Sequence, residues 1–142
     1  MKLEVLVADQ DVELAQLYCR FLADHELTAA AASSGLECLG MVRQWNPRVL
    51  VLDHELPWGD GEGVLACLRE DSLSLPVILT TWKTSATFAR QLIVPPVVVC
   101  LRKFFPLPAL LDNIRTCLPT ENHSSDSLEL SYQGDATWNA SR

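Results

Sequence analysis

The sequence predicts an α/β protein built on a doubly wound parallel sheet of five strands with helices on both faces. Short apolar segments alternate along the chain with segments in which apolar residues recur at helical spacing. Residues 49–52 are apolar throughout, without the alternation of a half-exposed strand, which is typical of a central parallel strand. A chain of 142 residues, 49% of them apolar, is long enough to bury such a sheet in one domain.

The first third of the chain contains two expected strands and two expected helices. Residues 3–8 are mostly apolar and predict the first strand, and the apolar residues of 12–24 recur every three or four positions, which predicts a helix. Residues 27–32 predict a weak second strand, because alanine is a poor strand former. Ser34 and Glu37 form a capping-box pattern that starts the second helix, and an Asn–Pro pair ends it.

The rest of the chain repeats this alternation. After the central strand, a loop with a proline and two glycines leads into a helix that contains residues 64–68. Residues 76–80 predict the fourth strand and residues 97–101 the fifth. A short helix is expected at 84–92 between them, and an amphipathic helix at 107–118 ends the pattern.

Polar residues stand where several of these strands end. In doubly wound sheets the ligand crevice lies outside the carboxyl ends of the strands, so Asp9, Asp11, Asp53, Thr81 and Lys103 should converge there. Clustered carboxylates favour a bound cation, and oxygen ligands suit Mg²⁺. A lysine and a hydroxyl opposite a carboxylate suit a phosphoryl group. A single Asp at a strand end is more often a cap or turn residue, so the prediction depends on the whole set.

Composition limits the classes of partner and compartment. The formal net charge is −7, which argues against a binder of nucleic-acid phosphates. The five cysteines form no CxxC pair, so we expect reduced, buried thiols in a cytoplasmic protein. No signal segment or membrane-spanning segment is evident. Residues 119–142 hold four acids, one base and several serines, which predicts an acidic, Ser-rich flexible tail after a domain at 1–118. The alternative is a small docking segment that uses the apolar residues of this tail, Leu128, Leu130, Tyr132 and Trp138.

Residues 3–118 resemble the CheY-like receiver domains of two-component response regulators, which have a flavodoxin-like fold. The resemblance rests on five segments: VLVADQD (5–11), SGLECLGMV (34–42), PRVLVLDHELPWGDG (47–61), PVILTTW (76–82) and LRKFF (101–105). It implies a signalling domain rather than an enzyme, phosphorylated by a histidine kinase or phosphotransfer protein and acting on a downstream protein partner. The length leaves no room for an attached output domain, so we expect a stand-alone regulator without direct nucleic-acid or membrane contact.

The resemblance assigns roles residue by residue. Asp53 is the implied phosphoacceptor, Thr81 the hydroxyl that would bond a phosphoryl oxygen, and Lys103 the partner of the phosphoryl charge. Asp9, Asp53 and the backbone carbonyl of Glu55 are the implied Mg²⁺ ligands.

The second acidic position of the family is occupied by Gln10, which removes one negative charge, so we expect weakened Mg²⁺ binding. The Gln10 amide oxygen itself, Asp11 or the Glu55 side chain could compensate. A Glu55–Lys83 ion pair could cross the mouth of the site, and we expect His54 to point away from it.

Four further departures from the family pattern fall on its switching side. Trp82 stands where a small residue is usual and could narrow the approach of a phosphodonor. Cys100 replaces an aromatic residue, Phe104 a proline, and Pro95–Pro96 a Gly–Ala pair. These changes leave two hypotheses open. One is a phosphoryl-accepting receiver, and the other is a phosphorylation-independent pseudo-receiver that acts as a protein-binding or dimerisation module. A homodimer would use the face around residues 94–118.

Overall fold

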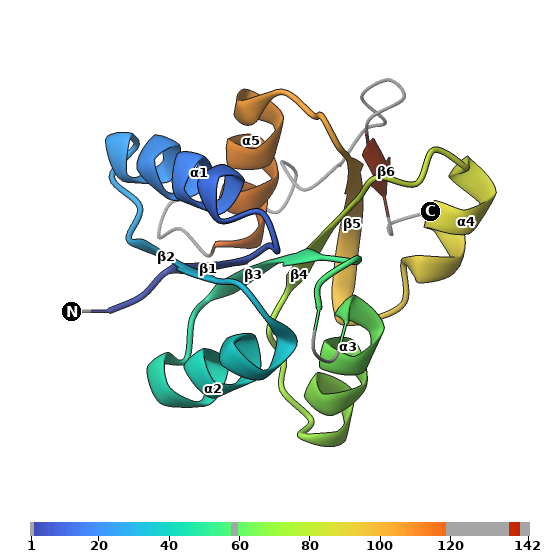
Figure 1. The fold of residues 1–142 in the computed structure, drawn as a ribbon, viewed down its shortest axis with the longest axis horizontal. Coiled ribbons are helices and arrows are strands. Elements are labelled where there is room, and N and C mark those ends of the chain that lie inside the picture. The colour runs from blue at the N-terminus through green and yellow to red at the C-terminus, as the bar shows by residue number, and fades with distance from the viewer. Residues whose placement is uncertain (1, 58–59, 119–136, 140–142) are drawn as a thin grey trace.

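A parallel sheet forms the centre of the computed structural model (Figure 1), which describes residues 2–57, 60–118 and 137–139. Its strand order is β2-β1-β3-β4-β5-β6, and all pairings from β2 to β5 are parallel. The strands are β1 (Val5–Ala8), β2 (Ala29–Ala32), β3 (Val49–Asp53), β4 (Val77–Thr81), β5 (Val97–Arg102) and β6 (Thr137–Asn139). The predicted doubly wound sheet of five parallel strands is therefore confirmed.

Helices cover both faces of the sheet, as Figure 1 shows. They are α1 (Val12–Asp24), α2 (Gly35–Trp45), α3 (Gly61–Glu70), α4 (Ala86–Leu92) and α5 (Leu107–Cys117). One core cluster joins α1 and α5 to the sheet, and the other joins α2, α3 and α4 to the opposite face. Every residue of β3 is buried, as the unbroken apolar segment predicts for a strand covered from both sides.

Local sequence signals explain where the first helices begin. The Asp11 carboxylate accepts a hydrogen bond from the Leu14 amide at 3.1 Å and so caps α1. Ser34 caps α2 by accepting from the Glu37 amide at 3.1 Å, while the Glu37 carboxylate accepts from the Ser33 amide at 2.7 Å. These two bonds confirm the predicted capping pattern. The Glu37 carboxylate, however, bonds the amide of Ser33, the residue before the cap, and not that of Ser34 itself.

The sixth strand was not expected from the sequence. β6 pairs antiparallel with β5, with Trp138 opposite Cys100 in the register, and it lies at the edge of the sheet in Figure 1. This strand falls within the segment predicted to be a flexible tail. The other residues of that segment, 119–136 and 140–142, lie outside the described part of the chain.

The remaining features concern the loops and the thiols. The peptide bonds Pro95–Pro96 and Lys103–Phe104 are both cis.

All five cysteines are free, and burial raises the pKa of the buried Cys38 and Cys100 thiols to about 12, with a smaller contribution from nearby carboxylates. Within the described ranges, no helix is both long and apolar enough to cross a membrane.

Candidate functional site

The carboxyl ends of four strands place the predicted site residues together. Asp53 is the last residue of β3 and Thr81 the last of β4, and the register pairs Asp53 with Thr80. Lys103 directly follows β5, and Asp9 directly follows β1. Parallel register therefore brings these side chains to one edge of the sheet, as the crevice rule predicts.

Lys103 lies between two buried carboxylates. Its Nζ is 2.9 Å from Asp9 Oδ2 and 3.3 Å from Asp53 Oδ1. No more than 2% of any of the three side chains is exposed, so little solvent screens these charges. Burial raises the pKa of Asp9 above its ordinary value, and the bonds from Lys103 and the Asp11 amide partly offset that rise. The positive ammonium group thus offsets the repulsion between the two neighbouring carboxylates.

Backbone amides fix the orientation of both carboxylates. Asp53 Oδ1 accepts from the Glu55 amide at 3.0 Å, and Asp53 Oδ2 accepts from the Gln10 amide at 3.3 Å. Asp9 Oδ1 accepts from the Asp11 amide at 2.8 Å, which leaves Oδ2 for Lys103. The amides come from the loops that follow β1 and β3, so folding of these loops sets the geometry of the site.

The further metal-ligand candidates are placed less favourably. The Asp11 side chain is engaged at the start of α1 through its bond to Leu14, and Gln10 is solvent-exposed and contributes its backbone amide to Asp53. Within the part of the chain that the structure describes, no three His, Cys, Asp or Glu residues gather closely enough to hold a metal ion. The fully buried carboxylates at this edge are Asp9 and Asp53.

The Glu55 side chain makes bonds that the sequence interpretation did not include. Its Oε2 accepts from the Thr81 hydroxyl at 2.8 Å, and its Oε1 accepts from the Trp82 amide at 3.1 Å. His54 Nδ1 lies 3.1 Å from Glu55 Oε2. Partial burial alone would raise the pKa of Glu55, but the bonds from Trp82, Thr81 and His54 outweigh it and lower that pKa below its ordinary value.

The Glu55–Lys83 ion pair that could cross the mouth of the site is absent from the salt bridges among the described residues. Lys83 Nζ instead lies 5.6 Å from the centre of the Phe88 ring, and the Lys83 amide donates to the Thr81 hydroxyl oxygen at 3.1 Å. The pair that the sequence allowed between Glu55 and Lys83 is therefore not formed. The nearby hydroxyl and amide of the β4 end offer shorter and less flexible partners than a lysine side chain.

Two aromatic side chains lie beside Lys103. The Trp82 ring centre is 5.4 Å from Lys103 Nζ, within the range of a cation–π contact. Trp82 and Phe104 pack edge to face at 4.6 Å, and they are 44% and 77% exposed. Trp82 therefore lies at the mouth of the site, where its expected effect on the approach of a phosphodonor remains a prediction.

His54 lies at the periphery of the site. Its ring packs edge to face against Phe88 on α4 at 5.5 Å, and its Nδ1 contacts Glu55, while its Nε2 is buried without a hydrogen-bond partner. It reaches the site through the Glu55 carboxylate. The position of Glu55 was a sequence signal for its contacts. Parallel register brings the loop after β3 to the end of β4, where Thr81 carries a hydroxyl and the following Trp82 an amide.

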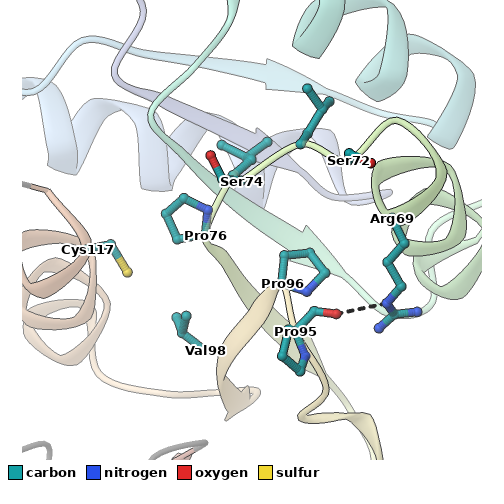
Figure 2. Close-up of a pocket in the computed structure, with 10 residues that line it drawn as sticks. Arg69, Ser72, Ser74, Pro76, Pro95, Pro96, Val98 and Cys117 are labelled. Carbon is teal, nitrogen blue, oxygen red and sulfur yellow. Dashed lines mark hydrogen bonds between the residues drawn. The ribbon is translucent and has the colours of Figure 1, made fainter.

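A separate pocket opens at the opposite edge of the sheet, at the amino ends of β4 and β5 (Figure 2). Pro76, Pro95 and Pro96 line it together with residues 72–75, and Arg69 Nε donates to the Pro95 carbonyl at 2.8 Å. Because parallel strands carry their carboxyl ends to the other edge, this pocket is not part of the Asp53 site.

Comparisons with known proteins agree with this geometry. Residues 5–115 match the family model described as the response regulator receiver domain. The DNA-binding response regulator MtrA of Mycolicibacterium paratuberculosis is 33% identical over 84 residues, which cover 59% of this chain and 37% of MtrA. The C4-dicarboxylate transport transcriptional regulatory protein DctD of Pseudomonas aeruginosa is 33% identical over 116 residues, 81% of this chain and 25% of DctD. The match with this chain therefore spans only 37% of the length of MtrA and 25% of that of DctD.

Solved structures show the same fold. The receiver domain of the Francisella response regulator 1452 superposes with a TM-score of 0.77 and 26% identity, covering 82% of this chain and 96% of that domain. The chemotaxis response regulator CheY4 of Vibrio cholerae superposes with a TM-score of 0.72 and 21% identity, over 83% of this chain and all of CheY4.

Proposed function

The chain belongs to the family of response regulator receiver domains, and we propose that it accepts a phosphoryl group on Asp53. Receiver domains are signalling domains of two-component systems that interact with histidine kinases and downstream effectors. The donor for this chain would be the phosphohistidine of a kinase or phosphotransfer protein. The output would be a change in contacts with another protein.

The observation that carries this proposal is the placement of Lys103. Its Nζ bridges Asp9 Oδ2 and Asp53 Oδ1, and all three side chains are buried at the edge of the sheet. An ammonium group there pairs with the Asp53 carboxylate, the proposed nucleophile, and can follow the negative charge as it moves to a phosphoryl oxygen.

The transfer requires one bond to form and one to break. An oxygen of the Asp53 carboxylate attacks the phosphorus, the bond from phosphorus to the donor imidazole nitrogen breaks, and that nitrogen keeps the electron pair and takes up a proton. The product is an acyl phosphate on Asp53. Hydrogen bonds from the Gln10 and Glu55 amides orient the carboxylate, while Lys103 and the Thr81 hydroxyl would bind phosphoryl oxygens.

Magnesium is the cofactor typical of receiver domains, which generally bind it at the acidic pocket. Asp9 Oδ2 is buried and has an ion pair to Lys103 but no donor in good hydrogen-bond geometry, which fits an oxygen that can also face a cation. Asp9, Asp53 and the Glu55 backbone carbonyl would hold the ion, which needs only one or two carboxylates because it retains several waters. When bound, it would neutralise charge on the phosphoryl oxygens. The neutral Gln10 should leave its affinity low.

The proposal is tested by intact-mass measurement after incubation with Mg²⁺ and a small-molecule phosphodonor. We expect the wild-type protein to gain the mass of one phosphoryl group, and we expect Asp53→Asn to gain none. Asp11→Asn serves as a matched control, since its carboxylate caps a helix outside the reacting groups. A wild-type protein that stays unmodified at high donor and Mg²⁺ concentrations would refute the proposal.

The second candidate function is a phosphorylation-independent protein-binding module. The exposed Trp82–Phe104 pair at the mouth of the site favours it, because paired exposed aromatic side chains are typical anchors of protein interfaces. Binding of a partner protein that is equal for wild-type and Asp53→Asn, and that is lost in Phe104→Ala, would support this alternative over the first.

A further inference from the structure

The Glu55 carboxylate occupies the two donors at the end of β4. Oε2 accepts from the Thr81 hydroxyl at 2.8 Å, and Oε1 accepts from the Trp82 amide at 3.1 Å. The Thr81 hydroxyl has a single proton, so it cannot donate to Glu55 and to a phosphoryl oxygen at once. Its oxygen also accepts from the Lys83 amide, which holds it in this orientation.

The backbone of Glu55 also contacts Asp53. The Glu55 backbone amide donates to Asp53 Oδ1 at 3.0 Å, and Asp53 is paired with Thr80 in the register next to Thr81. A phosphoryl group attached to Asp53 would therefore reach the end of β4 close to the Glu55 carboxylate. Two anions side by side in a partly buried site repel each other, and both seek the same donors.

We propose that the Glu55 carboxylate is an internal competitor of the phosphoryl group, which must displace it from Thr81 and Trp82 when Asp53 is modified. This inference rests on the proposed function and deepens it. In the unmodified protein an anion already binds the donors of β4. Phosphorylation then exchanges one anion for another instead of filling vacant donors.

The contacts of Glu55 explain how such a competitor is held. His54 Nδ1 lies 3.1 Å from Oε2, and the His54 ring is fixed against Phe88 of α4. The carboxylate therefore has three polar partners, from β4, from the residue after it and from its own loop. A phosphoryl group can accept hydrogen bonds from Thr81 and Trp82 only if Glu55 loses its own bonds to them.

Trp82 connects the site of this exchange with the surface of the protein. Its amide bonds Glu55 while its ring contacts Lys103 and Phe104. Release of Glu55 therefore changes the anchor of the exposed aromatic pair, which connects occupancy of the site with the shape of its mouth.

The experiment measures binding of beryllofluoride, a mimic of the phosphoryl group, in the presence of Mg²⁺. Wild-type protein is compared with Glu55→Gln, which keeps the shape but loses the charge, and with Glu55→Ala, which removes the group. Glu62→Gln is the control, because Glu62 is an exposed acid of α3 and its loss changes the net charge equally. Backbone amide resonances of Trp82 and Lys83 report the site, and circular dichroism checks that each variant is folded.

We expect both Glu55 variants to bind beryllofluoride about tenfold more tightly than the wild type, because charge-assisted hydrogen bonds no longer have to be broken. We expect Glu62→Gln to bind like the wild type. Without beryllofluoride, the Trp82 amide resonance should already shift in both Glu55 variants and remain in place in Glu62→Gln.

The outcomes separate this inference from the proposed function. Equal binding by the wild type and the Glu55 variants would overturn the competition and leave Asp53 as an acceptor. Binding by the Glu55 variants alone would support it strongly. A failure of every form to bind, with Asp53 intact, would overturn both. An unmoved Trp82 amide in Glu55→Ala would also overturn the inference, because that amide would then not be bonded to Glu55.

Discussion

Replacement of Lys103 by methionine removes the cation that separates two buried carboxylates while it keeps most of the volume of the side chain. Lys103 Nζ lies 2.9 Å from Asp9 Oδ2 and 3.3 Å from Asp53 Oδ1, and all three side chains are almost fully buried. Removal of one member of a buried ion pair costs about 3–5 kcal/mol, because the remaining charge has no partner. We expect Lys103→Met to lower the free energy of unfolding by about that amount at pH 7.

The pH dependence of this loss follows from the pKa of Asp9. Burial already raises that pKa above its ordinary value of 3.8, and the bonds from Lys103 oppose the rise. A carboxyl group whose folded-state pKa is raised binds its proton more tightly when folded, so it lowers stability as the pH increases through that range. Without Lys103 the pKa rises further, and the loss should shrink as the pH falls from 7 toward 5.

The assay is urea denaturation at both pH values, with two further variants. Asp9→Asn added to Lys103→Met should recover part of the stability, since it removes one of the facing charges. Arg43→Met breaks the exposed Arg43–Asp71 pair at 3.4 Å and should cost less than about 1 kcal/mol. A loss in Lys103→Met no larger than in Arg43→Met, and equal at both pH values, would refute the reasoning.

Three smaller predictions concern stability and are measured by denaturant or thermal unfolding. Hydrogen bonds lower the pKa of Glu55, so the ionised carboxylate should stabilise the fold at neutral pH, and this stabilisation should be lost as the pH falls below the ordinary Glu value of 4.5. Glu55→Gln should make the free energy of unfolding decrease less steeply with falling pH, and an unchanged slope would contradict the prediction. Ile78→Ala, in the fully buried centre of β4, should cost about 2–5 kcal/mol, against about 0.5 kcal/mol or less for the half-exposed Val94→Ala, and similar losses would argue against the core assignment. A Cβ at Gly61 would lie 2.7 Å from the His54 Cα, so Gly61→Ala should cost about 1–3 kcal/mol and disturb the loop after Asp53, whereas wild-type stability would contradict that close approach.

The sequence predicted the sheet because its signals are local and repeated. Residues 49–52 are apolar without alternation, and the strand they form is buried on both faces. Ser34 and Glu37 predicted the start of α2 through a mechanism that operates within one turn. Even β2 was predicted, although its alanines are poor strand formers, because the alternation of strands and helices requires a strand there.

The strand-end residues of the site followed from the same order, because parallel register carries Asp53, Thr81 and Lys103 to one edge. The contacts between side chains did not follow. The sequence allowed Glu55 to pair with Lys83, but the choice among a hydroxyl, an amide and a lysine depends on distances that cannot be obtained from sequence spacing. The pairing of β6 with β5 likewise depends on contacts between residues far apart in sequence, and the segment gives no strand pattern of its own.

The central claim is that Asp53 forms the acyl phosphate, and chemical trapping of that residue tests it most directly. Borohydride reduces an aspartyl phosphate to homoserine, which peptide mass spectrometry locates. After treatment with a small phosphodonor and Mg²⁺, we predict homoserine at position 53 and unmodified Asp9 and Asp11. Modification at another aspartate, or none at position 53 under conditions that modify an established receiver domain, would contradict the account.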